Sequence, residues 1–198
     1  MKITRRGIII GAQVGGFLGL LLAAFVFFLG PVYLFHAHGH CIKAAGSTLQ
    51  SYAAGHFGKF PHHTNGFGDA IVLLLKETES EQCPWLFTAP GDDGHLFAEC
   101  LKTGAHMPEE QCTRAYVQGL CQTNDPDIAL LFDRYATRGG DHWRRPWGPW
   151  LREVSVLGGG MRVIREDHWP EFRDRQIKLL LAAGLRRTEA EKLYAPMK

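Results

Sequence analysis

Hydrophobic residues are most concentrated near the start of the chain. Residues 7–35 contain no Asp, Glu, Lys or Arg, and their only strongly polar side chain is Gln13. A helix rises about 1.5 Å per residue, so about 20 residues cross a hydrocarbon core of about 30 Å. The run therefore predicts a long transmembrane anchor helix. It is too long for the apolar segment of a cleaved secretory signal, which usually has about 7–15 residues.

The basic residues around this run predict its orientation. Lys2, Arg5 and Arg6 precede it, and no acidic residue lies before it or within it. Because positive residues favour the cytoplasmic side, we expect residues 1–6 to form a cytoplasmic stub. Residues 36–198 then form one extracytoplasmic (periplasmic) domain. The prediction is a single-pass membrane protein, with the lipid bilayer as its first partner.

Beyond the anchor the hydrophobic pattern takes helical spacing. Cys41, Ala45, Leu49 and Tyr52 recur at intervals of four, four and three residues, which predicts an amphipathic helix ending near residue 54. Later apolar runs are bounded by turn residues and predict antiparallel strands. The other expected elements are a short helix over 70–76 with Asp69 as its N-cap, strands over 115–120, 128–132, 154–157 and 161–164, a helix beginning near Pro170, and a last helix with Thr188 and Glu191 as its capping box.

This order predicts an α+β protein. A long N-terminal transmembrane helix continues into an amphipathic helix that packs on a small antiparallel sheet, and helices close the chain. Charge excludes one class of partner. The stub holds three of the 22 basic residues, which leaves 19 against 20 acidic residues in the remainder. A nearly neutral domain does not favour binding to nucleic acid.

Short motifs add a resemblance. The helix pattern is followed by Gly58-Lys59-Phe60-Pro61, and Gly139-Gly140-Asp141-His142 precedes a hairpin whose turn is Gly158-Gly159-Gly160. In this order the chain resembles the type IV pilin-like proteins, including the type II secretion pseudopilins. The resemblance implies a membrane-anchored structural or accessory protein rather than an enzyme, a minor component of a secretion or surface assembly with other pilin-like or secretion subunits as partners. The family has Glu at the fifth position after the cleavage-site Gly; this chain has Ala12 there, so we expect no prepilin cleavage.

The histidines that follow the apolar run are candidate metal ligands. His36, His38 and His40 alternate with other residues and lead directly into Cys41. Imidazoles and thiolates suit Zn or Cu. On a helix only His36 and His40 share a face, as an i, i+4 pair. The simpler interpretation makes these residues polar groups at the bilayer edge, with no cofactor bound.

A second candidate set combines carboxylates with imidazole. Asp133, Asp141 and His142 have the chemistry for metal binding or acid–base work. Together with the histidines before the first exported helix, Asp141 and His142 support an alternative function, an exported metal-binding protein or metal-dependent enzyme. The simpler interpretation has Asp133 ending a strand and Asp141 fixing a Gly-rich loop.

Aromatic and basic residues crowd one predicted loop. Trp143, Arg144, Trp147 and Trp150 lie within eight positions of one another. If these side chains are exposed, they form a platform that can bind sugars or a partner protein. The alternative is a long loop that its own Trp side chains pack onto the domain.

The five cysteines all lie on the predicted exported side, where disulfides form. Cys112 and Cys121 flank a predicted strand that holds them up to about 30 Å apart, whereas a disulfide needs Cα atoms within about 7 Å. Cys100 and Cys112 are separated by a segment with Gly and Pro that doubles back, so we expect a disulfide between these two. A disulfide between Cys83 and Cys121 is an alternative that the sequence leaves open. Cys41 is expected to be buried and unpaired.

Overall fold

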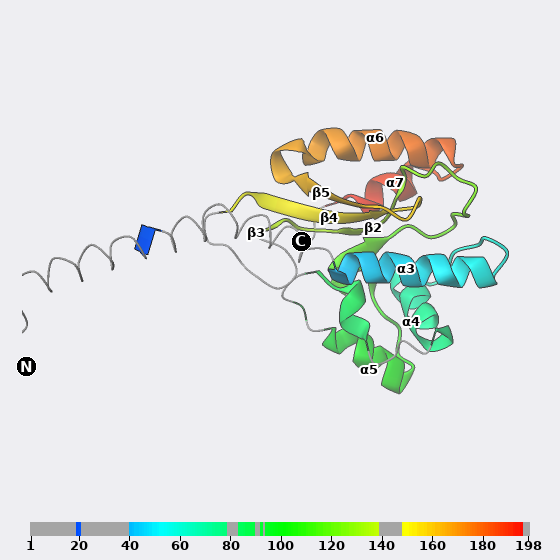
Figure 1. Cartoon of the computed structure of the whole chain (residues 1–198). Helices are drawn as coiled ribbons and strands as arrows, with labels where there is room; N and C mark the ends of the chain where they lie inside the picture. Colours follow the sequence, from blue (N-terminus) through cyan, green and yellow to red (C-terminus); the bar gives the residue numbers. More distant parts are fainter. Residues whose placement is uncertain are drawn as a thin grey trace, which may run out of the picture. The chain divides into compact units, whose positions relative to one another are not determined.

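The fold is α+β, with helices on both faces of a small antiparallel sheet (Figure 1). The computed structural model describes residues 19–20, 40–78, 83–89, 92, 94–138 and 148–195. The chain divides into residues 1–38 and residues 39–198, and the sheet with its covering helices lies in the second unit.

Helices precede and follow the strands in sequence. Before the sheet come α3 (His40–Gly55), α4 (Phe67–Glu77), α5 (His95–Thr103) and the short 3₁₀ helices η2 (Pro84–Phe87) and η3 (Glu109–Gln111). The strands are β1 (Arg114–Tyr116), β2 (Ala129–Asp133), β3 (Thr137–Arg138), β4 (Trp150–Val156) and β5 (Met161–Arg165). After them come η4 (Glu166–His168), α6 (Trp169–Ala182) and α7 (Arg187–Leu193).

Strand β4 is the centre of the sheet. It pairs with β2 and the short β3 on one side and with β5 on the other, and β1 pairs with β2. Gly159 lies at φ 84° in the β4–β5 turn, as the Gly-rich sequence predicts. A register shift interrupts β2 between Ala129 and Leu131. There the Gln176 side chain of α6 accepts a hydrogen bond from Ala129 N at 2.8 Å and so ties this helix to the sheet.

Helix α3 covers the opposite face from α6, with α4 and α5 beyond it (Figure 1). It approaches β4 closely because residue 46 is glycine: a Cβ there would lie 2.1 Å from Ser155 Oγ. The predicted helix is confirmed, but its buried face is rotated, since Cys41 and Tyr52 are only half-buried. The fully buried side chains of α3 are those of Ile42, Ala45, Leu49 and Ala53.

Aromatic rings fill the space between β2 and the C-terminal helices. Phe132 stacks on Tyr194 with ring centroids 4.5 Å apart, and Trp169 lies 5.8 Å from Phe132. Pro170 stands in the first turn of α6, as predicted. The capping box of α7 is formed by Arg186 and Glu189, so the predicted box is wrong by two positions.

A buried ion cluster joins three strands on the inside of the fold. Arg114 of β1 donates from Nε to Asp133 Oδ1 at 2.8 Å and from Nη2 to Glu153 Oε2 at 3.3 Å. It also donates from Nη1 to the carbonyl of Leu86 at 2.9 Å. All three charged side chains are almost completely buried.

The expected membrane anchor is corrected. No helix in the described ranges has both the length and the apolar composition needed to cross a bilayer. The longest of them, α3, has 16 residues, which is about 24 Å of helix against a core of about 30 Å. Of residues 7–35 only Gly19 and Leu20 are described, and the rest of that stretch lies outside the described residues. The predicted transmembrane helix, and the single-pass topology with a cytoplasmic N-terminus and a periplasmic domain, are therefore not retained.

Candidate acid–base site

The first residues of α4 lie very close to the segment that contains Met107 and Glu109. Helix α4 begins at Phe67, whose backbone N–H donates to Glu109 Oε1 at 3.0 Å. Gly66 has φ 128°, and a Cβ on it would lie 2.5 Å from the same oxygen. A Cβ on Gly68 would lie 2.3 Å from the carbonyl oxygen of Met107. These two glycines therefore let the segment before η3 lie directly against the first turn of α4.

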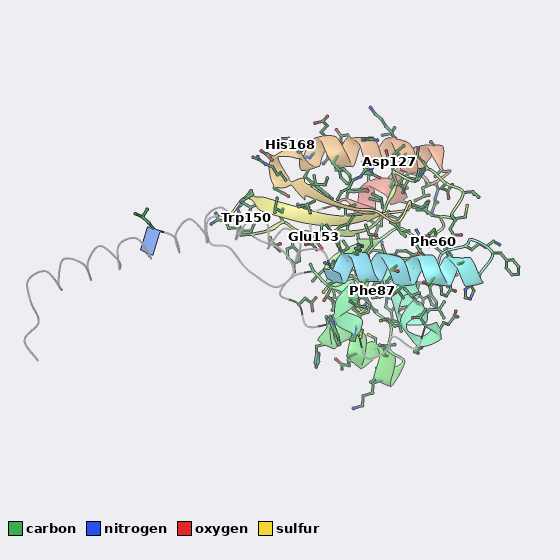
Figure 2. The ribbon with its side chains drawn as sticks, in the orientation of Figure 1. Phe60, Phe87, Asp127, Trp150, Glu153 and His168 are labelled. Carbon is green, nitrogen blue, oxygen red and sulfur yellow. The ribbon has the colours of Figure 1, made fainter. Side chains whose placement is uncertain are left out.

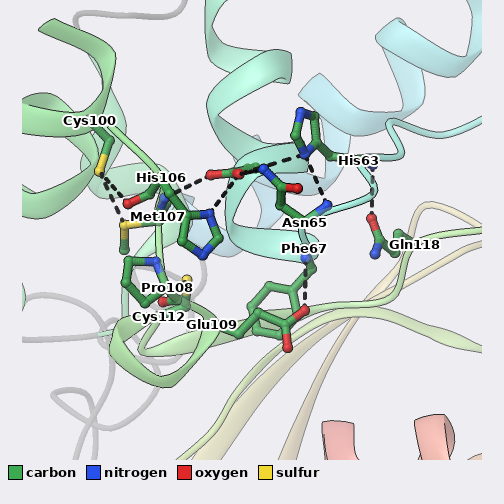
Figure 3. Close-up of polar contacts among 11 residues, drawn as sticks. His63, Asn65, Phe67, Cys100, His106, Met107, Pro108, Glu109, Cys112 and Gln118 are labelled. Carbon is green, nitrogen blue, oxygen red and sulfur yellow. Dashed lines mark hydrogen bonds and ion pairs between the residues drawn. The ribbon is translucent and has the colours of Figure 1, made fainter. Parts of the chain in front are cut away.

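Asp69 is the focus of this contact, and Figure 3 shows its hydrogen-bond partners Asn65, His106 and Met107 close to one another. Its carboxylate accepts from Met107 N at 2.7 Å, from His106 Nδ1 at 2.7 Å and from Asn65 Nδ2 at 3.1 Å. Burial raises the pKa of Asp69, but these hydrogen bonds to the charged form outweigh it and hold the pKa below its ordinary value. Asp69 is thus a buried carboxylate that stays ionised, and it lies inside α4 rather than at the predicted N-cap position.

The two neighbouring histidines hold their protons differently. An ionised carboxylate only accepts hydrogen bonds, so His106 Nδ1 must carry the proton that it donates to Asp69. In the neutral ring this leaves a lone pair on His106 Nε2, and the side chain is 50% exposed. His63 Nδ1 accepts from Asn65 N at 3.3 Å, so the proton of its neutral ring is on Nε2. Its Nδ1 lies 3.6 Å from Asp69 Oδ2, which is too long for a hydrogen bond.

A pocket of about 320 Å³ opens beside this pair. Asp69 and Lys76 both line it from α4, and seven residues of helix separate them by about 10 Å. Val72 gives the wall between them an apolar part. One end of the pocket therefore holds an oriented imidazole and the other a primary amine. The remaining lining residues are His63, Asn65, Leu73, Gly104, Ala105 and His106.

The cysteines near this site are not linked to each other, which corrects the expected disulfide. No disulfide joins any of the five cysteines, all of which the structure describes. Cys100 Sγ lies 3.6 Å from the carbonyl oxygen of His106 and 3.8 Å from Met107 Sδ. Cys112 Sγ instead lies 3.5 Å from the carbonyl oxygen of Pro108, and burial raises the pKa of this thiol to about 12. Each thiol thus has its own hydrogen-bond acceptor, and the predicted Cys100–Cys112 bond is absent.

Most of the sequence-predicted ligands lie elsewhere. His36, Asp141 and His142 are outside the described residues, and of His40 only the backbone, at the start of α3, is described. Asp133 is described, and it faces Arg114 in the ion cluster. The described residues contain no group of three His, Cys, Asp or Glu side chains that could hold a metal ion.

The predicted aromatic platform is described only at one end. Trp143, Arg144 and Trp147 lie outside the described residues. Trp150 begins β4, where its side chain is exposed (Figure 2). The guanidinium of Arg138 lies over its ring at 4.8 Å from the centroid. Binding to this loop stays a prediction.

Sequence reasoning assigned no chemical role to the residues of this site. The sequence predicts only a helix cap for Asp69, and neither His63 nor His106 belongs to a motif that indicates chemistry. The available signal was the spacing of glycines in Gly66-Phe67-Gly68-Asp69, which indicates a close approach at the start of a helix. This glycine spacing does not reveal which distant segment of the chain lies against the helix.

Compared with protein-family models, curated proteins and solved structures, the chain matches none. There is accordingly no family evidence for the resemblance to pilins or to secretion proteins. A structural or accessory role, with other subunits as partners, stays a prediction.

Proposed function

We propose that this domain is a hydrolytic enzyme in which His106 acts as the general base. One observation carries the proposal: the 2.7 Å hydrogen bond from His106 Nδ1 to the buried, ionised Asp69, which leaves Nε2 as the free nitrogen of a histidine that lines a pocket. In hydrolases with an Asp–His pair the carboxylate holds the tautomer and stabilises the imidazolium that forms during the reaction. General-base catalysis of this kind contributes about 10²–10⁴ in rate.

The nucleophile in this proposal is water. Among the described residues that line the pocket there is no Ser, Thr or Cys to attack a substrate directly. His106 Nε2 takes a proton from water as its oxygen attacks an ester carbonyl, and the same proton then goes to the leaving alkoxide. Water and ester are consumed, and a carboxylic acid and an alcohol are formed. Asp69 remains ionised throughout and is a positioning residue.

Lys76 suggests the substrate class. It is exposed at the far end of the pocket, about 10 Å along α4 from Asp69, and it forms no ion pair within the described ranges. A volume of about 320 Å³ admits a small molecule. We therefore assign the substrate as a small ester with an anionic group at the end away from the scissile bond.

The test uses the full chain and defined chromogenic esters. Wild-type protein is assayed with the 4-nitrophenyl esters of acetate and of succinate, and we expect hydrolysis with a preference for the anionic succinate ester. His106→Ala should lower kcat/KM by about 10²-fold or more, since it removes the base. Lys76→Gln should raise KM for the succinate ester and leave acetate ester hydrolysis unchanged.

His168→Ala is the matched control. His168 is an exposed histidine in η4, at the start of α6 and far from α4 in sequence (Figure 2). Its substitution should not alter the rate. The ¹⁵N spectrum of His106 provides a readout independent of substrate, because the Nδ1–H tautomer should be lost in Asp69→Asn. Equal rates in wild type and His106→Ala, or no hydrolysis of either ester, would overturn the proposed function.

A further inference from the structure

A larger cleft lies on the other side of the loop that carries Asn65. Its volume is about 780 Å³, and it runs between this loop, the residues after β1, and the segment from the end of α6 through α7. Arg134 and Lys192 are its strong cations. Leu185, Leu193 and Phe67 contribute apolar wall. This cleft is separate from the His106 pocket and has no role in the proposed hydrolysis.

Arg134 is held in place by carbonyl groups alone. Its Nη1 donates to the carbonyl oxygen of Glu109 at 2.6 Å and to that of Cys112 at 3.3 Å. Its backbone N–H donates to the carbonyl oxygen of Thr113 at 3.0 Å. Arg134 Nε is buried and has no hydrogen-bond partner among the residues that the structure describes. A buried donor without an acceptor is unfavourable, so this guanidinium is incompletely satisfied by the protein.

Two of the nearby carboxylates, those of Asp133 and Glu109, are engaged elsewhere. Asp133, the last residue of β2, precedes Arg134 in the chain but bonds to Arg114 instead. Glu109 uses one oxygen for Phe67 N and the other for Lys192 Nζ, which lies 2.7 Å away. Within the described ranges, no carboxylate forms an ion pair with Arg134. Arg134 is therefore a cation in a cleft wall that lacks a counter-charge.

Lys192, the other cation of the cleft, forms an ion pair with Glu109, whereas Arg134 forms none within the described residues. The hydrogen bond with Glu109 is the main cause that raises the pKa of Lys192. Glu189, another acid of the cleft wall, bonds both the backbone N–H and the guanidinium of Arg186. Of the charged side chains that line the cleft, Lys192, Glu109 and Glu189 are thus paired, whereas Arg134 and Glu110 have no ion pair within the described residues.

We propose that this cleft binds an organic carboxylate, with the carboxylate on Arg134 and the apolar body against Leu185 and Leu193. The ligand supplies the counter-charge that Arg134 lacks, since a guanidinium forms strong, charge-assisted hydrogen bonds with carboxylates. The apolar wall selects against inorganic anions of the same charge.

Titrations of the full chain followed by ¹H–¹⁵N NMR test this assignment, with hexanoate, hexanamide and inorganic phosphate as probes. Hexanoate should shift the Arg134 Nε–H signal and bind about tenfold or more tightly than hexanamide, which has the same body without the charge. Phosphate should bind more weakly than hexanoate. Because the probes are compared on wild-type protein, this result does not depend on a variant that folds.

Variants then locate the site. Arg134→Gln keeps a donor for the carbonyls of Glu109 and Cys112 but removes the charge, and it should weaken hexanoate binding about tenfold or more. Arg187→Gln is the matched control, since Arg187 is exposed on α7 and does not line this cleft. Equal binding of hexanoate and hexanamide, equal or tighter binding of phosphate, or unchanged hexanoate binding in Arg134→Gln would each overturn the proposal.

Discussion

Asp69 combines burial with a negative charge near neutral pH, and its three hydrogen-bond donors come from segments before and after it. Asn65 lies four residues earlier, whereas His106 and Met107 come from the segment after α5. The carboxylate therefore pins that later segment to the start of α4. A single residue thus fixes both the geometry of the His106 pair and the local fold.

This role gives the first stability prediction. Asp69→Asn should lower the free energy of unfolding near neutral pH by about 1–3 kcal/mol, since it removes hydrogen bonds to a buried charge. The folded state lowers the pKa of Asp69. The stabilisation is therefore fully present above the unfolded value of about 3.9 and is lost as the pH falls through the lower folded value.

Urea unfolding at a series of pH values measures this difference. The gap between wild type and Asp69→Asn should be constant above about pH 5 and should narrow as the pH is lowered further. Asp174→Asn, which changes an exposed carboxylate of α6, serves as the control and should show no comparable gap. A gap that does not change down to about pH 3 would contradict the assignment of a lowered pKa to Asp69.

The sequence predicted Asp69 to lie near a helix start and missed its partners. Helix α4 begins two residues before Asp69 because Glu109, 42 positions away, accepts the hydrogen bond of Phe67 N. No local pattern carries that information. His106 lies in a segment with no regular periodicity, so its approach to Asp69 follows from tertiary packing alone.

At the scale of elements, periodicity was the most informative signal. It located α3, the β4–β5 hairpin and α6, because each buries one continuous apolar face or turns at glycine. It failed for β1, which ends at Tyr116 and not near residue 120, and for the rotation of α3. The inward face of α3 includes Gly46, which hydrophobicity does not mark but which β4 requires.

The contact between α3 and β4 gives an element-scale prediction. Gly46→Ala should destabilise the fold by about 1–3 kcal/mol through overpacking, despite the higher helix propensity of Ala. Combining it with Ser155→Ala should recover part of the loss, since the 2.1 Å contact is with Ser155 Oγ and the next atom lies at 3.2 Å. Denaturant unfolding of the two single variants and the double variant measures this coupling.

Gly55→Ala is the control within the same helix. A Cβ at Gly55 meets nothing within 4 Å, so this substitution should be neutral or slightly stabilising. If Gly46→Ala were equally neutral, the close approach of α3 to β4 would be refuted.

At the scale of the whole molecule, Arg114 connects parts of the chain that are distant in sequence. It reaches Leu86 before the sheet, Asp133 in β2 and Glu153 in β4. Arg114→Met should therefore destabilise the protein by about 3–5 kcal/mol, because it leaves two carboxylates buried without their arginine. Thermal and denaturant unfolding of the full chain measure the loss.

A compensated variant separates charge from packing. Adding Asp133→Asn and Glu153→Gln to Arg114→Met removes the buried charges and should recover part of the stability. A loss below about 1 kcal/mol for Arg114→Met alone would show that the cluster is not a stabilising link.

The burial of α3 under β4 also has a consequence in time. The face formed by Ile42, Ala45, Leu49 and Ala53 is covered in part by a strand that is synthesised about 100 residues later. At about 5–20 residues per second, the ribosome needs roughly 5–20 s to supply it. During that interval the nascent chain displays a bare apolar stripe. The growing chain, rather than the finished protein, is then the form most in need of a chaperone.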